Sequence, residues 1–559
     1  MLRRLSYRLL VLVSAVALLN ALVGPALAAS NARVTNDGSA NSYARYDGGT
    51  DAALTACSTG RRPQNEPTVA VDPHNVDVIA AGSNDYCLQT TGGDVWAGYY
   101  RSTDGGGTWS NSLVPGYPGD TSPAGSASGT SGVCNAAGDP TQSFDNSGRL
   151  FYGFICFNRA KPSNGNFYVA TYENDGADYV RTTAVATGTP SVWGIFNDKV
   201  NLVVDQTSGP RSGTIYVGWV KYPGQAANNV LQVARSTDHG VSFSKPVRVS
   251  QGLGEEQFAD LAVGPDGSLY ATWRIFAHQK STSVDIWTAK STDGGLTFSN
   301  PVRIATAISA FDGEAFDQAG ACGDGPFTCA SGLTYPRFAS LAAIAADASG
   351  VHVVWNGRLP SGQSKVFVRN SPDGLSWPTA VAQVDAIAAG HQWFPDIASA
   401  DGTITAIFYD SRADPAYSPD RPSGNAATGA NSGNVVNVVA AHSTDGGVTW
   451  TEATANTAGS NLNWEQFGSR RSSFMGDYIY VSAVPGRVVG AWTDTRDVVP
   501  GADPRETGAS DDADGFDVFQ GGCVYTPNDI NAPSYSSPLI SDACLSQGGL
   551  DSNIYAGGL

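Results

Sequence analysis

Basic residues are scarce in this sequence of 559 residues, which has 33 Lys and Arg against 51 Asp and Glu and a formal net charge of −18. A chain with this charge is repelled by phosphate backbones and anionic lipid headgroups, which argues against nucleic acid or an anionic membrane as its main partner. The composition also argues against disorder, because 41% of the residues are hydrophobic and 10% are aromatic, enough to bury a large core.

Long apolar runs are missing after residue 23. The one such run, residues 9–23, follows three arginines and precedes the small residues Ala26 and Ala28. This order is typical of a secretory signal peptide cut after Ala28 or Ala29, with a membrane anchor as the alternative. We therefore expect residues 1–29 to be removed and the mature protein to be secreted, extracellular, monomeric and without membrane insertion.

Zinc-type motifs are also missing, because no Cys-x-x-Cys pair occurs and the six histidines are scattered. We expect no transition-metal site and no required cofactor. The eight cysteines are even in number, and export makes disulfides the expected state. Of the many possible pairings we expect the sequential one, which closes short loops: Cys57–Cys87, Cys134–Cys156, Cys322–Cys329 and Cys523–Cys544.

In place of helical periodicity, one strand–turn–strand pattern recurs seven times after the first thirty residues. In each copy, turn residues separate two runs of apolar and β-branched residues, which is a hairpin signature. The copies are residues 66–86, 139–157, 199–222, 258–276, 337–358, 394–412 and 476–496. Strand-only repeats of this kind predict an all-β fold, a single β-propeller of four-stranded blades.

A second motif follows several of these hairpins. It reads S-T-D-x-G-x-[ST]-[WF] from Ser102, Ser236, Ser291 and Ser443, and a shortened copy begins at Ser371. The Asp carboxylate can accept backbone N–H bonds within its own turn, the glycines permit positive φ, and the aromatic residue can pack between sheets. We therefore interpret the motif as a folding device and not as a catalytic group.

This motif is the Asp box, or BNR repeat, and over roughly residues 60–525 the sequence resembles the bacterial sialidase (neuraminidase) superfamily. The resemblance implies a propeller over residues 61–530, with an N-terminal segment at 30–60 and a C-terminal tail with a disulfide at 531–559. It also implies that the Asp boxes lie on the face away from the active site. We favour seven blades, one per hairpin, and six, the sialidase number, is the alternative. A strand from residues 31–48 or the tail after Tyr525 is needed to close the ring.

In a propeller, the starts of the innermost strands and the ends of the second strands share one face around the axis. The expected starts carry carboxylates, with a register uncertain by one or two residues: Glu66, Asp139, Asp198, Asp260, Asp396 and Asp477. The expected second-strand ends carry the arginines Arg274, Arg358, Arg412 and Arg496. Arg337, in Tyr335-Pro336-Arg337, is the nearest match to the Arg-Ile-Pro of sialidases, which the first copy lacks.

Guanidinium groups bind carboxylates in bidentate fashion, so these arginines and carboxylates predict a substrate-binding ring for an acidic sugar. The alternative is that each arginine pairs with a nearby aspartate and only ties loops together. Under the sialidase resemblance, Tyr478 beside Asp477 is the candidate nucleophile, Asp410 or Asp494 the candidate acid, and a glutamate the partner of the tyrosine. The available glutamates are Glu255, Glu256, Glu314 and Glu465, and the alternative for Tyr478 is an aromatic residue packed at a strand start.

An acidic loop at residues 503–517 contains Asp511, Asp512, Asp514 and Asp517 and could hold a structural calcium ion or simply be solvated. Taken together, the sequence predicts a secreted, sialidase-like glycoside hydrolase, of exo-α-sialidase type, acting on an acidic glycan or glycoconjugate at the top face. Two alternatives remain open. One is a non-catalytic secreted propeller that binds glycan or protein, and the other is a polysaccharide lyase or endo-glycanase on the same fold.

Overall fold

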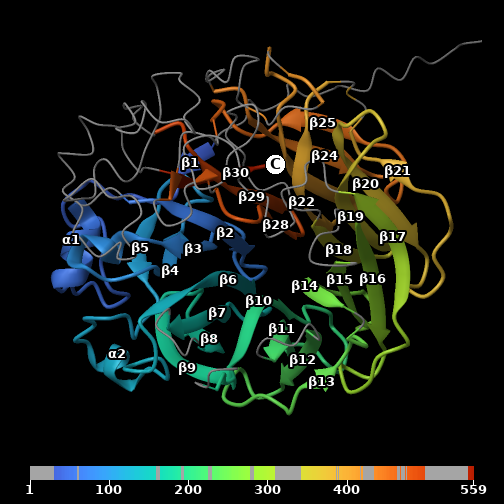
Figure 1. Cartoon of the computed structure of the whole chain (residues 1–559). Coiled ribbons are helices and arrows are strands. Elements are labelled where there is room, and N and C mark those ends of the chain that lie inside the picture. The colour runs from blue at the N-terminus through green and yellow to red at the C-terminus, as the bar shows by residue number, and fades with distance from the viewer. Residues whose placement is uncertain are drawn as a thin grey trace, which may run out of the picture.

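The computed structural model describes most of the chain after residue 30 and consists almost entirely of β-strands (Figure 1). The described residues are 31–59, 62–158, 164–189, 194–223, 229–252, 254–276, 283–308, 341–385, 387, 389–415, 417–419, 423, 434–461, 466–467, 472–473, 475–497 and 552–559. The expected signal peptide, Arg337 and the acidic loop at 503–517 lie outside these ranges. None of the helices in the described ranges has the length and hydrophobicity to span a bilayer.

Four antiparallel sheets of four strands follow the chain in order. The first contains β2 (Gln64–Val71), β3 (Ile79–Asp85), β4 (Trp96–Ser102) and β5 (Ser110–Leu113). The second contains β14 (Glu255–Val263), β15 (Leu269–Phe276), β16 (Ser283–Ser291) and β17 (Val302–Ile308). The third contains β18 (Ala342–Asp347), β19 (Gly350–Arg358), β20 (Ser364–Ser371) and β21 (Ala382–Gln383). The fourth contains β22 (Gln392–Ala400), β23 (Thr403–Asp410), β24 (Asn437–Ser443) and β25 (Thr451–Thr454).

An eight-stranded sheet holds two further antiparallel groups, which a single parallel bridge between Gly165 and Phe196 joins. The first group is β6 (Ala136–Phe144), β7 (Leu150–Asn158), β8 (Asn164–Glu173) and β9 (Asp178–Ala186). The second is β10 (Ile195–Val204), β11 (Ile215–Pro223), β12 (Val230–Ser236) and β13 (Val247–Arg248). The strands β26 (Gln466–Phe467) and β27 (Ser472–Ser473) form a separate ribbon.

The last four-stranded sheet joins the two ends of the described chain. Its order is β28 (Tyr480–Val484), β29 (Arg487–Asp494), β30 (Asn553–Gly558) and β1 (Asn31–Arg33). Both segments that the sequence offered for ring closure are therefore used, the N-terminal one as the outer strand and the C-terminal one as the third strand. The segment at 531–559 is thus part of the sheet at residues 553–558 and not only a tail.

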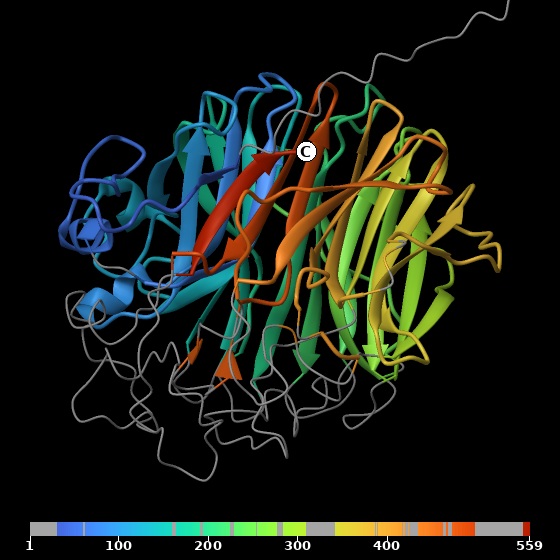
Figure 2. The ribbon, with the colours of Figure 1, turned by 90° about the horizontal axis from the view of Figure 1, so that it is seen from above.

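The sheets are arranged as a wheel (Figure 1). Their innermost strands contact one another in a closed ring, which runs β2, β6, β10, β14, β18, β22, β28 and back to β2. Figure 2 shows the wheel from the side, with the strands running between its two faces. The fold is therefore the all-β propeller architecture that the repeats predicted.

The hydrophobic core lies between neighbouring sheets. One cluster, for example, joins Val233 of β12 to Leu261 of β14 and Trp273 of β15. Tryptophans near the ends of second strands are almost completely buried, as at Trp219, Trp273 and Trp492. Because each wedge of core is shared by two sheets, the apolar face of one sheet is covered only when its neighbour is in place.

The Asp boxes have the local geometry that the sequence predicted. In the copy at residues 443–450, Ser443 Oγ donates to Asp445 Oδ1 at 2.8 Å, and the backbone N–H of Thr449 donates to the same oxygen at 2.9 Å. Bonds of this kind from Thr449 hold the pKa of Asp445 well below its usual range. Trp450 packs against a core cluster between two sheets. The motif is therefore a turn-forming device in this chain.

Three short helices and two disulfides occur in the described part of the chain between β1 and β8, with α2 in contact with β9. The helices are α1 (Ala52–Thr59), η1 (Cys87–Thr91) and α2 (Pro123–Ala127), where the sequence indicated no helical period. The pairings Cys57–Cys87 and Cys134–Cys156 are present as expected. The other two expected pairs lie outside the described residues.

Candidate functional site

Bulges in the innermost strands place one side chain from each of five repeats at the same level of the wheel. In β2, β6, β10, β14 and β22 the register against the second strand shifts at the same place. The residue at each shift has a left-handed φ between 49° and 54°: Glu66, Asp139, Lys199, Phe258 and Phe394. A bulge redirects a side chain, and a left-handed non-glycine residue costs energy and is concentrated at functional sites.

Four carboxyl groups and one ammonium group meet near the axis, and we name this set the axial cluster: Glu66, Asp139, Asp198, Lys199 and Asp477. Lys199 Nζ lies 2.8 Å from Asp477 Oδ2 and 3.5 Å from Asp139 Oδ2. The backbone N–H of Asp477 donates to Glu66 Oε1 at 3.1 Å. The cluster thus joins the starts of β2, β6 and β10 to the segment that leads into β28.

Aromatic and amide side chains surround the axial cluster. Lys199 Nζ lies 4.7 Å from the ring centre of Phe258 and 6.0 Å from that of Tyr478. Asn84 donates from Nδ2 to Glu66 Oε2 at 2.6 Å and accepts at Oδ1 from the backbone N–H of Asp139 at 2.8 Å. The Asn84 amide therefore fixes two of the four carboxyl-bearing residues relative to each other.

Burial and like charges raise the pKa values of two carboxyl groups of the axial cluster, Glu66 and Asp198. Burial, with Asp139 as the strongest negative neighbour, raises the pKa of Glu66 well above its usual value. The same two causes raise the pKa of Asp198 to about 7. Burial alone would lower the pKa of Lys199, but the carboxylates of Asp139 and Asp477 outweigh it and hold that pKa well above its usual value. The cluster therefore combines a permanent ammonium with carboxyl groups that keep protons near neutral pH.

Asp260 and Asp396 form a second, deeper layer. Each lies two residues beyond the bulge residue of its strand and accepts a backbone N–H from the next innermost strand: Asp260 from Ile344 at 2.7 Å and Asp396 from Val481 at 2.6 Å. Burial raises the pKa of Asp260 to about 7, and burial together with Asp260 raises the pKa of Asp396 well above its usual value. These two predicted ring residues therefore link neighbouring sheets by hydrogen bonds.

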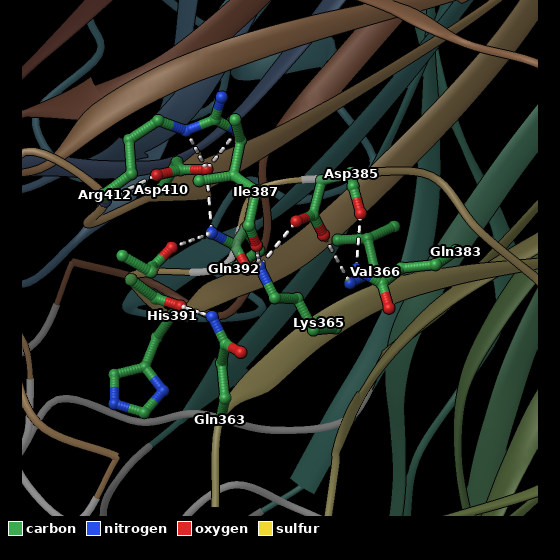
Figure 3. A network of polar contacts seen from close by, with 12 residues as sticks. Gln363, Lys365, Val366, Gln383, Asp385, Ile387, His391, Gln392, Asp410 and Arg412 are labelled. Atoms are coloured by element: carbon green, nitrogen blue, oxygen red, sulfur yellow. Dashed lines mark hydrogen bonds and ion pairs between the residues drawn. The ribbon is translucent and has the colours of Figure 1, made fainter. Parts of the chain in front are cut away.

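Arg412 belongs to a different polar network, which contains Asp410 and Gln392 (Figure 3). Its guanidinium is held by Asp410 Oδ2 at 2.6 Å from Nη2 and by Glu452 of β25 at 2.6 Å from Nη1. Gln392 donates to the same Asp410 oxygen at 3.0 Å, and nearby Lys365 forms a buried ion pair with Asp385 at 2.6 Å. Arg412 and Asp410 thus pair with each other and reach toward an outer strand.

Arg496 repeats this arrangement in the last sheet. Its Nη2 lies 2.6 Å from Asp494 Oδ2, and its Nη1 donates to Thr457 Oγ1 at 3.0 Å and to Asn31 Oδ1 of the outer strand β1 at 3.4 Å. For the two Asp-x-Arg motifs the structure therefore has the alternative arrangement, in which each arginine pairs with its own aspartate. The reason is local, because the two side chains are two residues apart at a strand end.

The remaining predicted arginines have different surroundings. Arg274 is 3% exposed, lies 4.5 Å from the ring centre of Phe258 and donates to Gln257 Oε1 at 3.0 Å, so it borders the axial cluster from below the surface. Arg358 is exposed at the end of β19. The structure therefore places one of the four described arginines against the ring of Phe258, which Lys199 of the axial cluster also contacts.

Tyr478 borders the axial cluster, and burial followed by the charge of Glu66 raises its pKa well above the usual value. The phenol of Tyr478 therefore keeps its proton near neutral pH, and attack by its oxygen requires a base that accepts this proton. Of the glutamates that the sequence offered as that base, Glu256 is fully buried and accepts backbone N–H bonds from Leu231 and Gly252. Glu314 and Glu465 lie outside the described residues, and Glu66 is the glutamate whose charge acts on Tyr478.

Sequence reasoning missed Lys199 and Asn84. Lys199 occupies the bulge position at which two earlier repeats have Glu66 and Asp139. The available signal was the change from an acidic to a basic residue at one repeat position, because a lysine there faces the carboxylates of the neighbouring repeats. Asn84 carries no such signal, because its role depends on how β3 and β6 pack.

Comparison with known proteins gives structural similarity without a family assignment. No protein-family model matches the chain, and no curated protein matches it. Among solved structures, it is similar to a microbial sialidase, Hadza Hz136 (14% identity, TM-score 0.40, 75% of this chain and 70% of that one). It is also similar to a leech intramolecular trans-sialidase (12%, 0.39, 63% and 65%) and to an α-L-arabinofuranosidase from Fusarium graminearum (12%, 0.36, 64% and 87%). At these values, the function has to be argued from the chain's own site.

Proposed function

We propose that this protein is a glycoside hydrolase whose reaction takes place at the axial cluster. The observation that carries the proposal is the convergence of four carboxyl groups on Lys199 at the starts of the innermost strands. Hydrolysis of a glycosidic bond needs one protonated carboxyl group for the leaving oxygen and a second carboxylate that attacks the sugar or activates water. Two carboxyl groups in different environments have different pKa values, which is the usual way for an enzyme to keep one protonated and the other ionised at the same pH.

Asp198 and Asp139 fit these two roles best. Asp198 is partly exposed, and its pKa of about 7 leaves a proton available near neutral pH, so we assign it as the acid. Asp139 has a side chain that is 13% exposed and lies 3.5 Å from the ammonium of Lys199, so we assign it as the carboxylate partner. In the sialidase-like variant of this proposal, Tyr478 attacks the sugar and Glu66 takes the phenol proton in its ionised form, which its raised pKa restricts to alkaline conditions.

An acidic glycan is the finer part of the proposal. Its support is one cation within the cluster, Lys199, and a second one, Arg274, near it, although Lys199 is engaged with two carboxylates and Arg274 is buried. Of the four described arginines that the sequence assigned to the ring, Arg358 is the exposed one. A neutral glycan is the competing substrate class, because the described cluster contains more acidic than basic groups.

A non-catalytic propeller that binds glycan or protein is the second candidate. The observation that favours it is the pairing of Arg412 and Arg496 with their own aspartates, which a repeated structural motif alone would produce. We also propose that the seven groups of four strands are seven blades and that the protein acts outside the cell, where disulfides such as Cys57–Cys87 persist.

The test uses purified chain lacking residues 1–29 and a panel of fluorogenic glycosides that includes a sialoside, uronides and neutral sugars. We expect turnover of at least one glycoside, with kcat lowered at least about 100-fold in Asp198→Asn and Asp139→Asn. Asp293→Asn, in an Asp box, is the matched control and keeps full activity. Tyr478→Phe separates the tyrosine variant from direct attack by a carboxylate. Binding of glycans without turnover of any substrate would favour the second candidate.

A further inference from the structure

Two turns from neighbouring sheets meet on the face of the wheel that carries the Asp boxes. The β2–β3 turn contributes Asp72 and His74, and the β8–β9 turn contributes Asp175. His74 Nδ1 lies 3.1 Å from Asp175 Oδ1, and one ligand atom from each of the three residues lies within 4.8 Å of the other two. Asp175 follows His74 by about a hundred residues in the chain, so no sequence motif indicates this set of three residues.

Asp72 has a buried oxygen without a hydrogen-bond partner among the described residues. The residue is fully buried, and its Oδ1 accepts the backbone N–H of His74 at 2.8 Å, while no described residue bonds its Oδ2. A buried carboxylate oxygen without a partner is costly, since nothing replaces the water that it lost. This oxygen and Asp175 Oδ1 both border Gly148, because the Cβ of any other residue there would lie 3.3 Å from Asp72 Oδ2 and 2.2 Å from Asp175 Oδ1.

The corresponding turn of the next repeat has its own cation. There Asp145 is 3% exposed, accepts the backbone N–H of Ser147 at 2.8 Å and has Arg149 Nη1 at 3.3 Å from its Oδ2. The turn at residues 72–78 contains no Lys or Arg, and a second carboxylate, Asp175, lies near its buried aspartate instead. Where one repeat supplies an arginine from its own turn, the other therefore presents two carboxylates and an imidazole, and Arg101 of β4 donates from Nε to the backbone oxygen of Asp175 at 2.7 Å.

We propose that Asp72, His74 and Asp175 bind a divalent cation of the zinc class. Imidazole nitrogen is a ligand that Zn²⁺ accepts readily and that Ca²⁺ and Mg²⁺ avoid. The 3.1 Å between His74 Nδ1 and Asp175 Oδ1 matches the edge of roughly 3.3 Å expected for a tetrahedral site with bonds of about 2.0 Å. Three protein ligands leave a fourth position for water. The ion links the β2–β3 turn to the β8–β9 turn and so ties two neighbouring sheets together, independently of the proposed hydrolase reaction.

The test uses the chain lacking residues 1–29 and any affinity tag, stripped with a chelator and dialysed. We expect calorimetry to give one Zn²⁺ per chain at this site and thermal unfolding to shift upward by at least about 2 °C in excess Zn²⁺. Ca²⁺ and Mg²⁺ should give smaller shifts. His74→Gln, at a side chain that is 57% exposed, should keep the fold and weaken Zn²⁺ binding at least about 10-fold.

Asp175→Asn is the second variant, and His239→Asn, at an exposed histidine with a left-handed φ, is the matched control that should bind as the parent does. Absence of Zn²⁺ binding, or binding that both His74→Gln and Asp175→Asn leave unchanged, would overturn the site. Tighter binding of Ca²⁺ than of Zn²⁺ would overturn the assigned class of ion.

Discussion

Lys199 shows how a single residue can reverse the character of a repeat position. At the same left-handed bulge, the first two repeats place Glu66 and Asp139, and the third places a lysine that contacts Asp139 and Asp477. Without this ammonium, four carboxyl groups would share a largely buried volume, and mutual repulsion would force most of them to stay protonated. The lysine therefore sets how many negative charges the axial cluster can hold.

We predict that Lys199→Met destabilises the protein by on the order of 3 kcal/mol at pH 7.5, because it leaves buried carboxylates without their cation. The loss should shrink at pH 5.5, since protonated carboxyl groups no longer need the ammonium. Urea unfolding at the two pH values measures both effects. Lys290→Met is the matched control, because Lys290 Nζ bonds the backbone oxygen of Asp373 at 3.0 Å and its loss should be the same at both pH values. An equal loss at both pH values for Lys199→Met would contradict the prediction.

At the scale of elements, the Asp box shows how a turn is held by one buried hydroxyl. Ser443 Oγ accepts the backbone N–H of the buried Gly447 at 2.9 Å while donating to Asp445. We predict that Ser443→Ala destabilises the protein by about 1–2 kcal/mol, because the Gly447 N–H loses its partner, and leaves glycoside turnover unchanged. Thr444→Ala, at the exposed neighbouring residue, should change neither the stability nor the glycoside turnover. Lowered turnover in Ser443→Ala at full folding would contradict the separation of the two faces.

The elements also show which parts of the site were predictable. Hairpins and Asp boxes have local signatures, and the sequence predicted them with the correct turn chemistry. The carboxylate ring was predicted as one level, but Asp260 and Asp396 lie two residues beyond the bulges, which is about 6.6 Å along a strand. They therefore belong to a deeper layer. The bulge that makes this difference depends on the register against the second strand, and a single sequence does not reveal that register.

At the scale of the whole molecule, the ring is closed by a short outer strand. Residues 31–33 of β1 pair with Tyr555, Ala556 and Gly557 of β30, so the N-terminal segment covers the edge of the last sheet. We predict that deletion of residues 31–33 costs about 2–4 kcal/mol in lost hydrogen bonds and exposes β30 to pairing with other chains. Thermal unfolding and light scattering at rising concentration measure the two effects. Asn31→Ala, which keeps the β1 backbone, should remain monomeric, and a deletion variant that is equally stable and monomeric would contradict this account of closure.

The stability of the whole wheel should fall as the pH rises from 5 to 8. The two axial layers contain carboxyl groups whose folded pKa values are raised, to about 7 for Asp198 and Asp260 and well above the usual value for Glu66 and Asp396. In the unfolded chain such groups lose their protons near pH 4, so between pH 4 and the folded pKa values the native state binds more protons. Each retained proton is worth about 1.4 kcal/mol per pH unit, and this stabilisation is lost as the pH rises through the folded pKa.

Groups with the opposite shift act outside this window or weakly within it. The pKa of Asp104 in the first Asp box is lowered to about 2 by its bond from the Thr108 backbone, so its contribution is lost only in strong acid. Burial lowers the pKa of His442, so its contribution to the free energy of unfolding rises with pH below pH 6.5. This single group opposes the four carboxyl groups of the axial layers whose pKa values are raised. Denaturant unfolding of the parent and of Asp260→Asn between pH 5 and pH 8 tests the prediction. In Asp260→Asn the free energy of unfolding should fall less steeply with pH than in the parent, whatever its absolute value, because an amide at this position cannot titrate. An equal pH dependence in the two proteins would remove Asp260 from the set of proton-retaining groups.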